Sequence, residues 1–137
     1  MRLAIAAPLV VVVAAACGSS HHTATAKARP KPLPFRAVLH APTHHPRVGK
    51  PWLYSVRVTD LHGRPIRARI RMQVLFGGVA VGKVDGGKTF TFTGTWREPK
   101  RAPLIWPARS RGRTLTFEAI VTARGASNRL DYQVTVR

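Results

Sequence analysis

From residue 35 to the C-terminus, apolar and polar residues alternate along most of the chain. In the run 66–74 every second side chain is apolar, and the intervening ones are Arg67, Arg69, Arg71 and Gln73. A helix, at 100° per residue, would scatter these arginines into the apolar side, whereas a strand turns successive side chains to opposite faces. The pattern predicts a β-strand with one buried face and one solvent-exposed face.

The same period of two recurs in the runs 52–58, 90–96, 115–121 and 130–136, and more weakly in 35–40 and 79–84. Turn-forming segments separate these runs, and no segment after residue 34 has a helical period of useful length. About seven short strands at this spacing predict an all-β, antiparallel β-sandwich. The alternation places these side chains in its core: Tyr54, Val56, Ile70, Phe92, Phe117, Tyr132 and Val134.

One long connection, 97–113, interrupts the regular succession of short strands and turns. It holds three prolines and six lysines or arginines around the apolar triplet 104–106. Long loops in compact domains are often functional. The alternative, which we favour, is that the triplet forms a short edge strand whose pairing the prolines limit.

The N-terminal segment predicts export. Leu3 to Ala16 is an uncharged stretch of 14 residues behind Arg2, a length that suits a signal peptide and is short for a bilayer-spanning helix. The residues 18–34 are small, polar and finally proline-rich, as in an unstructured tether. We therefore expect a signal peptide at 1–16, a tether at 17–34 and a folded domain at 35–137.

The junction at the only cysteine of the chain, "AAACGSS", resembles the lipobox of bacterial lipoproteins, with Ala14 where that family usually has Leu. The resemblance implies that Cys17 becomes the mature N-terminus and carries a diacylglyceryl group on its sulfur. The protein would then be lipid-anchored at the outer face of the cell membrane. Ala14 to Ala16 also satisfies an ordinary signal peptidase, so the alternative is a freely secreted, extracellular protein.

A second resemblance covers 46–72. Pro46, Gly49, Asp60, Gly63 and Pro65 reproduce the "P-x-x-G" lead-in and the "D-x-x-G-x-P-I" turn of bacterial immunoglobulin-like domains, including the YtkA-like domains of exported proteins. The resemblance implies an Ig-like sandwich and carries no activity with it.

The charge of the chain suggests an anionic partner. Lys and Arg number 23 against five acids, which gives a formal net charge of +18. Arg67, Arg69 and Arg71 project from one face of a strand and Arg57 from the exposed face of the strand before it. We expect these four to form a cationic patch for anionic lipid or a wall polymer. Export and the scarcity of aromatic residues for stacking disfavour nucleic acid. The alternative is a solvated face, with arginine enriched by codon composition.

Catalysis by side chains needs a paired acid and base or an activated nucleophile, and the sequence offers neither. Asp60 and Asp85 lie in turns, and we expect Glu118 and Asp131 on solvent-exposed strand faces. His40, His44 and His45 could bind copper or zinc if His62 shared their end of the sandwich. We therefore expect a non-catalytic binding or scaffolding module of the cell envelope without a cofactor; the alternative is a metal-binding accessory protein.

Overall fold

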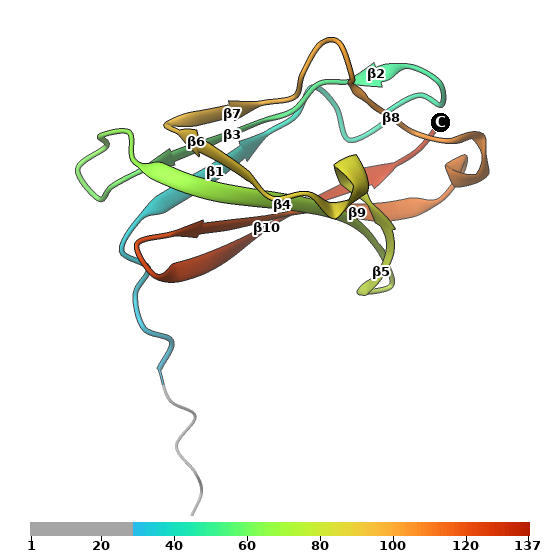
Figure 1. Cartoon of the computed structure of the whole chain (residues 1–137). Helices are drawn as coiled ribbons and strands as arrows, with labels where there is room; N and C mark the ends of the chain where they lie inside the picture. The colour runs from blue at the N-terminus through green and yellow to red at the C-terminus, as the bar shows by residue number, and fades with distance from the viewer. Residues whose placement is uncertain (1–28) are drawn as a thin grey trace, which may run out of the picture. The chain divides into compact units, whose positions relative to one another are not determined.

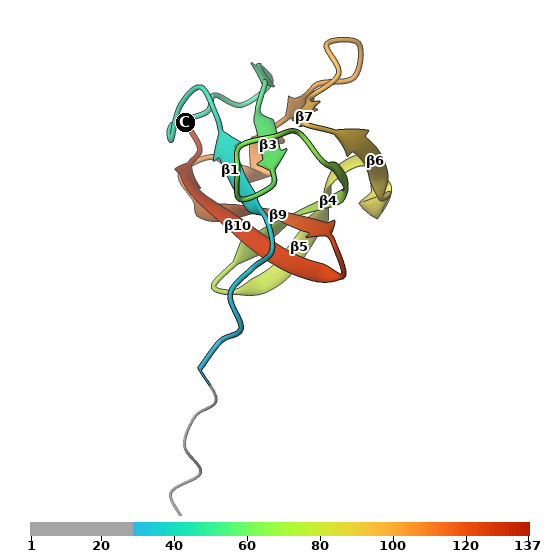
Figure 2. The same cartoon turned by 90° about the vertical axis from the view of Figure 1, so that its left-hand side faces the viewer.

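The computed structural model describes residues 29–137, and its domain consists of two layered antiparallel sheets and a short ribbon (Figure 1). The view at 90° shows the layers stacked face to face (Figure 2). One layer has the strand order β1 (Arg36–His40), β3 (Ser55–Thr59), β7 (Thr95–Arg97). Among the described residues, no helix is long and apolar enough to span a bilayer.

The other layer is a five-stranded sheet. Its order is β10 (Ala126–Thr135), β9 (Thr114–Ala123), β4 (Arg67–Phe76), β5 (Val79–Lys83), and β6 (Phe90–Thr93) also pairs with β4. The remaining elements are short: the ribbon of β2 (Pro51–Trp52) and β8 (Leu104–Ile105), and the 3-10 turns η1 (Val84–Gly87) and η2 (Ala108–Ser110).

The strand order is that of immunoglobulin-like sandwiches. β1, β3 and β7 take the places of strands A, B and E, and β10, β9, β4 and β5 those of G, F, C and C′. The predicted all-β, antiparallel sandwich is therefore confirmed for the described residues. The predicted edge strand at 104–106 is also confirmed, as β8.

The core lies between the inner faces of the two sheets. Of the side chains predicted there, Tyr54, Val56, Ile70, Phe117 and Val134 are buried. Phe92 and Tyr132 are only half-buried, although both pack against the core. Leu33 also packs against it, so the last residues of the predicted tether contact the domain. The predicted signal peptide, Cys17 and residues 18–28 of the tether lie outside the described residues.

The run 90–96, expected as one strand, is divided between the two sheets at Gly94. This residue has φ 75°, and its backbone accepts from Val58 N–H (2.6 Å) and donates to the Ile66 carbonyl (3.1 Å). A Cβ at this position would lie 3.1 Å from Cβ of Pro65. Glycine is required here because it permits both the left-handed backbone and the close approach of Pro65. The chain crosses from β6 in the large sheet to β7 in the small one at this point.

Candidate anion-binding face

The arginines of β4 point out of the five-stranded sheet. Arg67, Arg69 and Arg71 are exposed, whereas the residues between them, Ala68 and Ile70, are buried. Alternate residues of a strand lie about 7 Å apart on the same face. The predicted orientation is therefore confirmed, and the three guanidinium groups form a row, which we call the arginine row.

Hydroxyl side chains flank the arginine row on both sides. Thr91 of β6 and Thr122 of β9 are both register partners of Arg69. Ser127 of β10 is the register partner of Thr122, and their hydroxyl oxygens lie 2.9 Å apart. These hydroxyls can donate hydrogen bonds to the same ligand that a guanidinium group binds.

Two hollows open on this face. The first has a volume of about 310 Å³ and the second about 290 Å³. Arg69 and Thr122 line both of them. The other polar side chains of the first hollow are Arg71, Thr89 and Ser127, and those of the second are Arg67, Thr91 and Arg124. Neither lining contains a carboxylate, so both hollows are rich in positive charge and hydrogen-bond donors.

Two acidic residues beside this face, Asp60 and Glu118, are held by other cations. Asp60 pairs with Arg64 (3.1 Å) and more distantly with Arg124 (3.9 Å), and its pKa is lowered chiefly by the backbone N–H of Arg64. Glu118 pairs with Arg129 (3.3 Å). Within residues 29–137, no ion pair reaches the arginine row. Its three charges therefore lie side by side without a neutralising acid.

Glu118 differs from the expectation of a solvent-exposed side chain. It points outward, as predicted, but only 2% of its surface is exposed. The side-chain amide of Gln73 donates to it (2.6 Å), and Arg129 also covers it. Burial and the charge of Glu118 together raise the pKa of the neighbouring Asp131. Arg129 is thus paired with an acid, whereas the arginine row has no acidic partner within residues 29–137.

Arg57, the fourth residue of the expected patch, is not part of this face. It lies on β3 of the three-stranded sheet, where its register partners are Val38 and Thr95. Its side chain is exposed on the outer surface of that layer, while Val56 and Val58 beside it are fully buried. The patch therefore consists of Arg67, Arg69 and Arg71, with Arg124 added from the β9–β10 turn.

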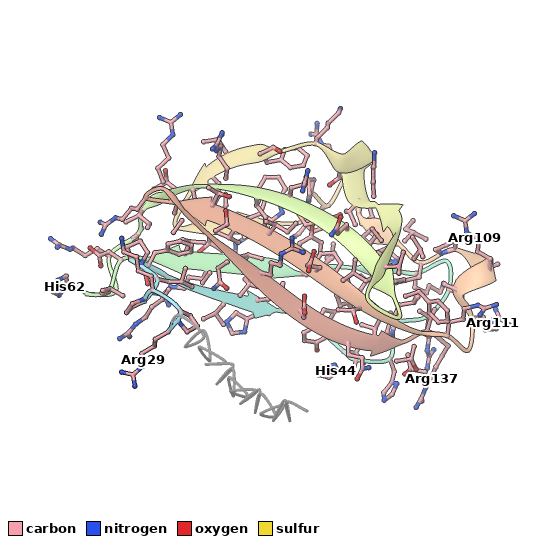
Figure 3. All side chains as sticks on the ribbon, turned by 90° about the horizontal axis from the view of Figure 1, so that it is seen from below. Arg29, His44, His62, Arg109, Arg111 and Arg137 are labelled. Atoms are coloured by element: carbon pink, nitrogen blue, oxygen red, sulfur yellow. The ribbon has the colours of Figure 1, made fainter. Side chains whose placement is uncertain are left out.

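The histidines proposed as an alternative metal site do not lie together in a cluster. His44 stacks on Tyr132 with ring centroids 4.1 Å apart and donates from Nδ1 to the carbonyl oxygen of Gln133 (2.7 Å). His62 lies at the other end of the sandwich, as Figure 3 shows. His40 and His45 are exposed. Residues 29–137 contain no group of three His, Cys, Asp or Glu side chains that could hold a metal ion. The same view places Arg109 and Arg111 of the long connection far from His62 (Figure 3).

A second polar cluster lies inside the sandwich, around Glu98. Only 5% of Glu98 is exposed, and neither of its carboxylate oxygens has a hydrogen-bond partner. The hydroxyl of Tyr54 and one oxygen of Asp85 are also buried without a partner. Burial raises the pKa of Glu98, and the charge of Asp85 adds to this effect. Burial likewise raises the pKa of Tyr54, and Glu98 contributes.

Sequence reasoning missed this cluster, although a signal for it exists. The alternation that puts Trp96 on an inward face puts Glu98, two residues later, on the same side. Because the carboxyl oxygens are closed off from solvent, we assign the cluster to the core and not to ligand binding. Glu98 lies close enough to the Tyr54 hydroxyl and to the backbone N–H of Leu104 for both to lower its pKa, but neither contact has the geometry of a formed hydrogen bond.

No protein-family model, curated protein or solved structure matches the chain.

Proposed function

We propose that this protein is a non-catalytic binding module of the bacterial cell envelope, related to exported Ig-like domains, that binds anionic groups through the arginine row. The observation that carries the proposal is a row of three exposed guanidinium groups, without acidic partners in residues 29–137, beside two hollows lined by hydroxyls. Phosphate, sulfate and carboxylate groups match this donor set, because arginine offers several N–H donors and no acceptor.

The energetics of the row support a ligand. Like charges placed side by side on a sheet destabilise it, although water and salt screen them over about 8 Å. An anion bound among the guanidinium groups would remove this repulsion. Against an anionic envelope surface, each basic residue contributes about 1 kcal/mol, so the row contributes ~3 kcal/mol. A total of this size changes binding more than a hundredfold.

Replacement of Arg67, Arg69 and Arg71 by threonine should weaken binding to anionic vesicles by about a hundredfold. Threonine keeps the β-propensity of the strand, and the loss of like-charge repulsion should leave the stability unchanged or slightly raised. The full chain carrying Cys17→Ser, which removes the expected lipid site, is titrated with vesicles with and without anionic lipid. The free energy of unfolding of each variant is measured by chemical denaturation.

The matched control is the outer surface of the other sheet. Arg36, Arg57 and Arg97 are exposed on β1, β3 and β7, and their replacement by threonine changes the net charge by the same amount. This control variant should bind nearly as well as the parent. If the two triple variants lose equal affinity, the net charge alone drives binding, and the arginine row is an ordinary solvated face.

We also propose that Cys17 carries the lipid that holds the chain at the membrane. The support is the uncharged segment that ends in Ala-Ala-Ala-Cys, with no second cysteine available for a disulfide. Two acyl chains anchor a protein stably, whereas a single chain binds only marginally. In a lipoprotein-competent bacterium, the wild-type chain should incorporate labelled fatty acid and sediment with membranes, and Cys17→Ser should do neither. Unlabelled wild-type protein in the medium would instead indicate simple secretion.

A further inference from the structure

The two hollows of the arginine row are adjacent and share part of their lining. Each is lined by two successive arginines of β4 together with hydroxyls from both sides of that strand, and the second hollow also has Arg124. Arg69 and Thr122 belong to both. The pair Arg67 and Arg69 repeats the pair Arg69 and Arg71 after a step of two residues, which is about 7 Å along a strand. The face therefore repeats one anion-binding arrangement at that spacing.

Each hollow suits an anion with several oxygen acceptors. Its guanidinium groups and hydroxyls supply many donors, and no carboxylate in the lining competes for them. Phosphate and sulfate oxygens form charge-assisted hydrogen bonds with arginine that are roughly twice as strong as neutral ones. A ligand that carries two such groups about 7 Å apart fills both hollows at once, and the second contact becomes intramolecular.

The surroundings of the hollows favour a polymer over a bilayer. Surfaces that lie on membranes bury large apolar or aromatic side chains among the headgroups. The large apolar residues exposed on this domain are Val38, Leu53, Leu61, Phe76, Val79, Val81 and Ile105, and none of them lines either hollow. The linings also contain no aromatic ring on which a nucleic-acid base could stack.

Taken with the proposed function, on which this inference rests, the geometry points to a defined ligand class. We propose that the arginine row binds a linear polyanion without bases, such as a phosphodiester polymer, whose charged groups recur about every 7 Å, with successive groups seated in the two hollows. Arg69 occupies the central position because it contacts both groups.

The test measures affinity as a function of ligand length. The probes are inorganic phosphate, glycerol phosphate and a poly(glycerol phosphate) oligomer of about ten units, titrated into the full chain carrying Cys17→Ser. Bivalent contact should make the oligomer bind at least a hundredfold more tightly than glycerol phosphate. Anionic vesicles and single-stranded DNA of equal total charge are compared in the same buffer, and both should bind more weakly than the oligomer.

Single substitutions test the shared position. Arg69→Thr should weaken binding of the oligomer by about a hundredfold, whereas Arg67→Thr and Arg71→Thr, each affecting one hollow, should weaken it by about tenfold. Arg57→Thr is the control and should have little effect. Equal losses at the three positions of the row, or an oligomer no tighter than its monomer, would overturn the two-site arrangement while leaving anion binding intact. Tighter binding of vesicles or DNA would overturn the ligand class. If no anion binds, the proposed function itself fails.

Discussion

Phe117→Ala should lower the free energy of unfolding by about 3–5 kcal/mol, which is the usual cost of deleting a large buried aromatic side chain. Phe117 is fully buried and packs in an aromatic cluster around Trp52. Its ring centroid is 4.5 Å from that of Tyr54 and 5.2 Å from that of Trp52. The substitution leaves a cavity that these neighbouring rings cannot fill without moving. Domains of this size are stable by only about 5–15 kcal/mol, so much of the protein would unfold under mild denaturant.

Thr116→Ala is the matched control for this prediction. Thr116 precedes Phe117 on β9 and points to the outer face, where it is the register partner of Leu75 and Gln133. Its replacement should cost less than about 1 kcal/mol, chiefly through lost β-propensity. Chemical denaturation of both variants gives the comparison. A loss at Thr116 as large as or larger than that at Phe117 would contradict this assignment of faces, because a shift of β9 by one residue exchanges the two faces of the strand.

The alternation of residues was sufficient to predict most of the strands and the face on which most of their side chains lie. The arginine row is an example of such a prediction. The alternation is visible among neighbouring residues of the sequence, and the outward direction of Arg69 follows from it. The register between strands is not local. The pairing of Arg69 with Thr91 and Thr122 joins three separate strands. No short pattern in the sequence contains that pairing, so the hydroxyls of the hollows could not be assigned beforehand.

Arg57 shows a second limit of sequence patterns. Strands β3 and β4 follow each other across the turn 60–65, and a hairpin would have placed Arg57 beside the row. The structure instead puts the two strands in different sheets. A short turn between alternating runs is compatible with both a hairpin and a crossing between layers. The contacts that decide between them, such as those of Gly94 with Val58 and Ile66, come from a residue much later in the chain, between β6 and β7.

Glu98→Gln should stabilise the protein at pH 8, by about 1–3 kcal/mol, the cost of leaving a buried polar group without a partner. Glu98 is buried with both carboxylate oxygens unpaired, and no ion pair of residues 29–137 reaches it. Glutamine has nearly the same shape and no charge. Its amide can donate to Asp85 or Tyr54, which lie near enough to Glu98 to affect its pKa.

The pH dependence of this effect has a defined sign. Burial raises the pKa of Glu98 in the folded state above its ordinary value of 4.5. Protonated Glu98 therefore contributes its full share to the free energy of unfolding at pH values below 4.5. This contribution is lost as the pH rises through the raised pKa of the folded state. The difference in unfolding free energy between variant and wild type should be near zero at pH 4 and grow toward pH 8. Subtracting the two at each pH cancels the contributions of groups that do not interact with Glu98.

Glu118→Gln provides the opposite case in the same protein. Glu118 is equally buried, but its carboxylate is paired with Arg129 and accepts a hydrogen bond from Gln73. Neutralising it removes the ion pair, so this variant should lose up to about 1 kcal/mol at pH 8, a small value because Arg129 is largely exposed to solvent. Two buried glutamates should thus respond to the same substitution with opposite signs. A loss of stability in Glu98→Gln at pH 8 would mean that the Glu98 carboxylate is ionised and held by a donor or a cation. The cluster with Tyr54 and Asp85 would then have to be reassigned from the core to a binding site.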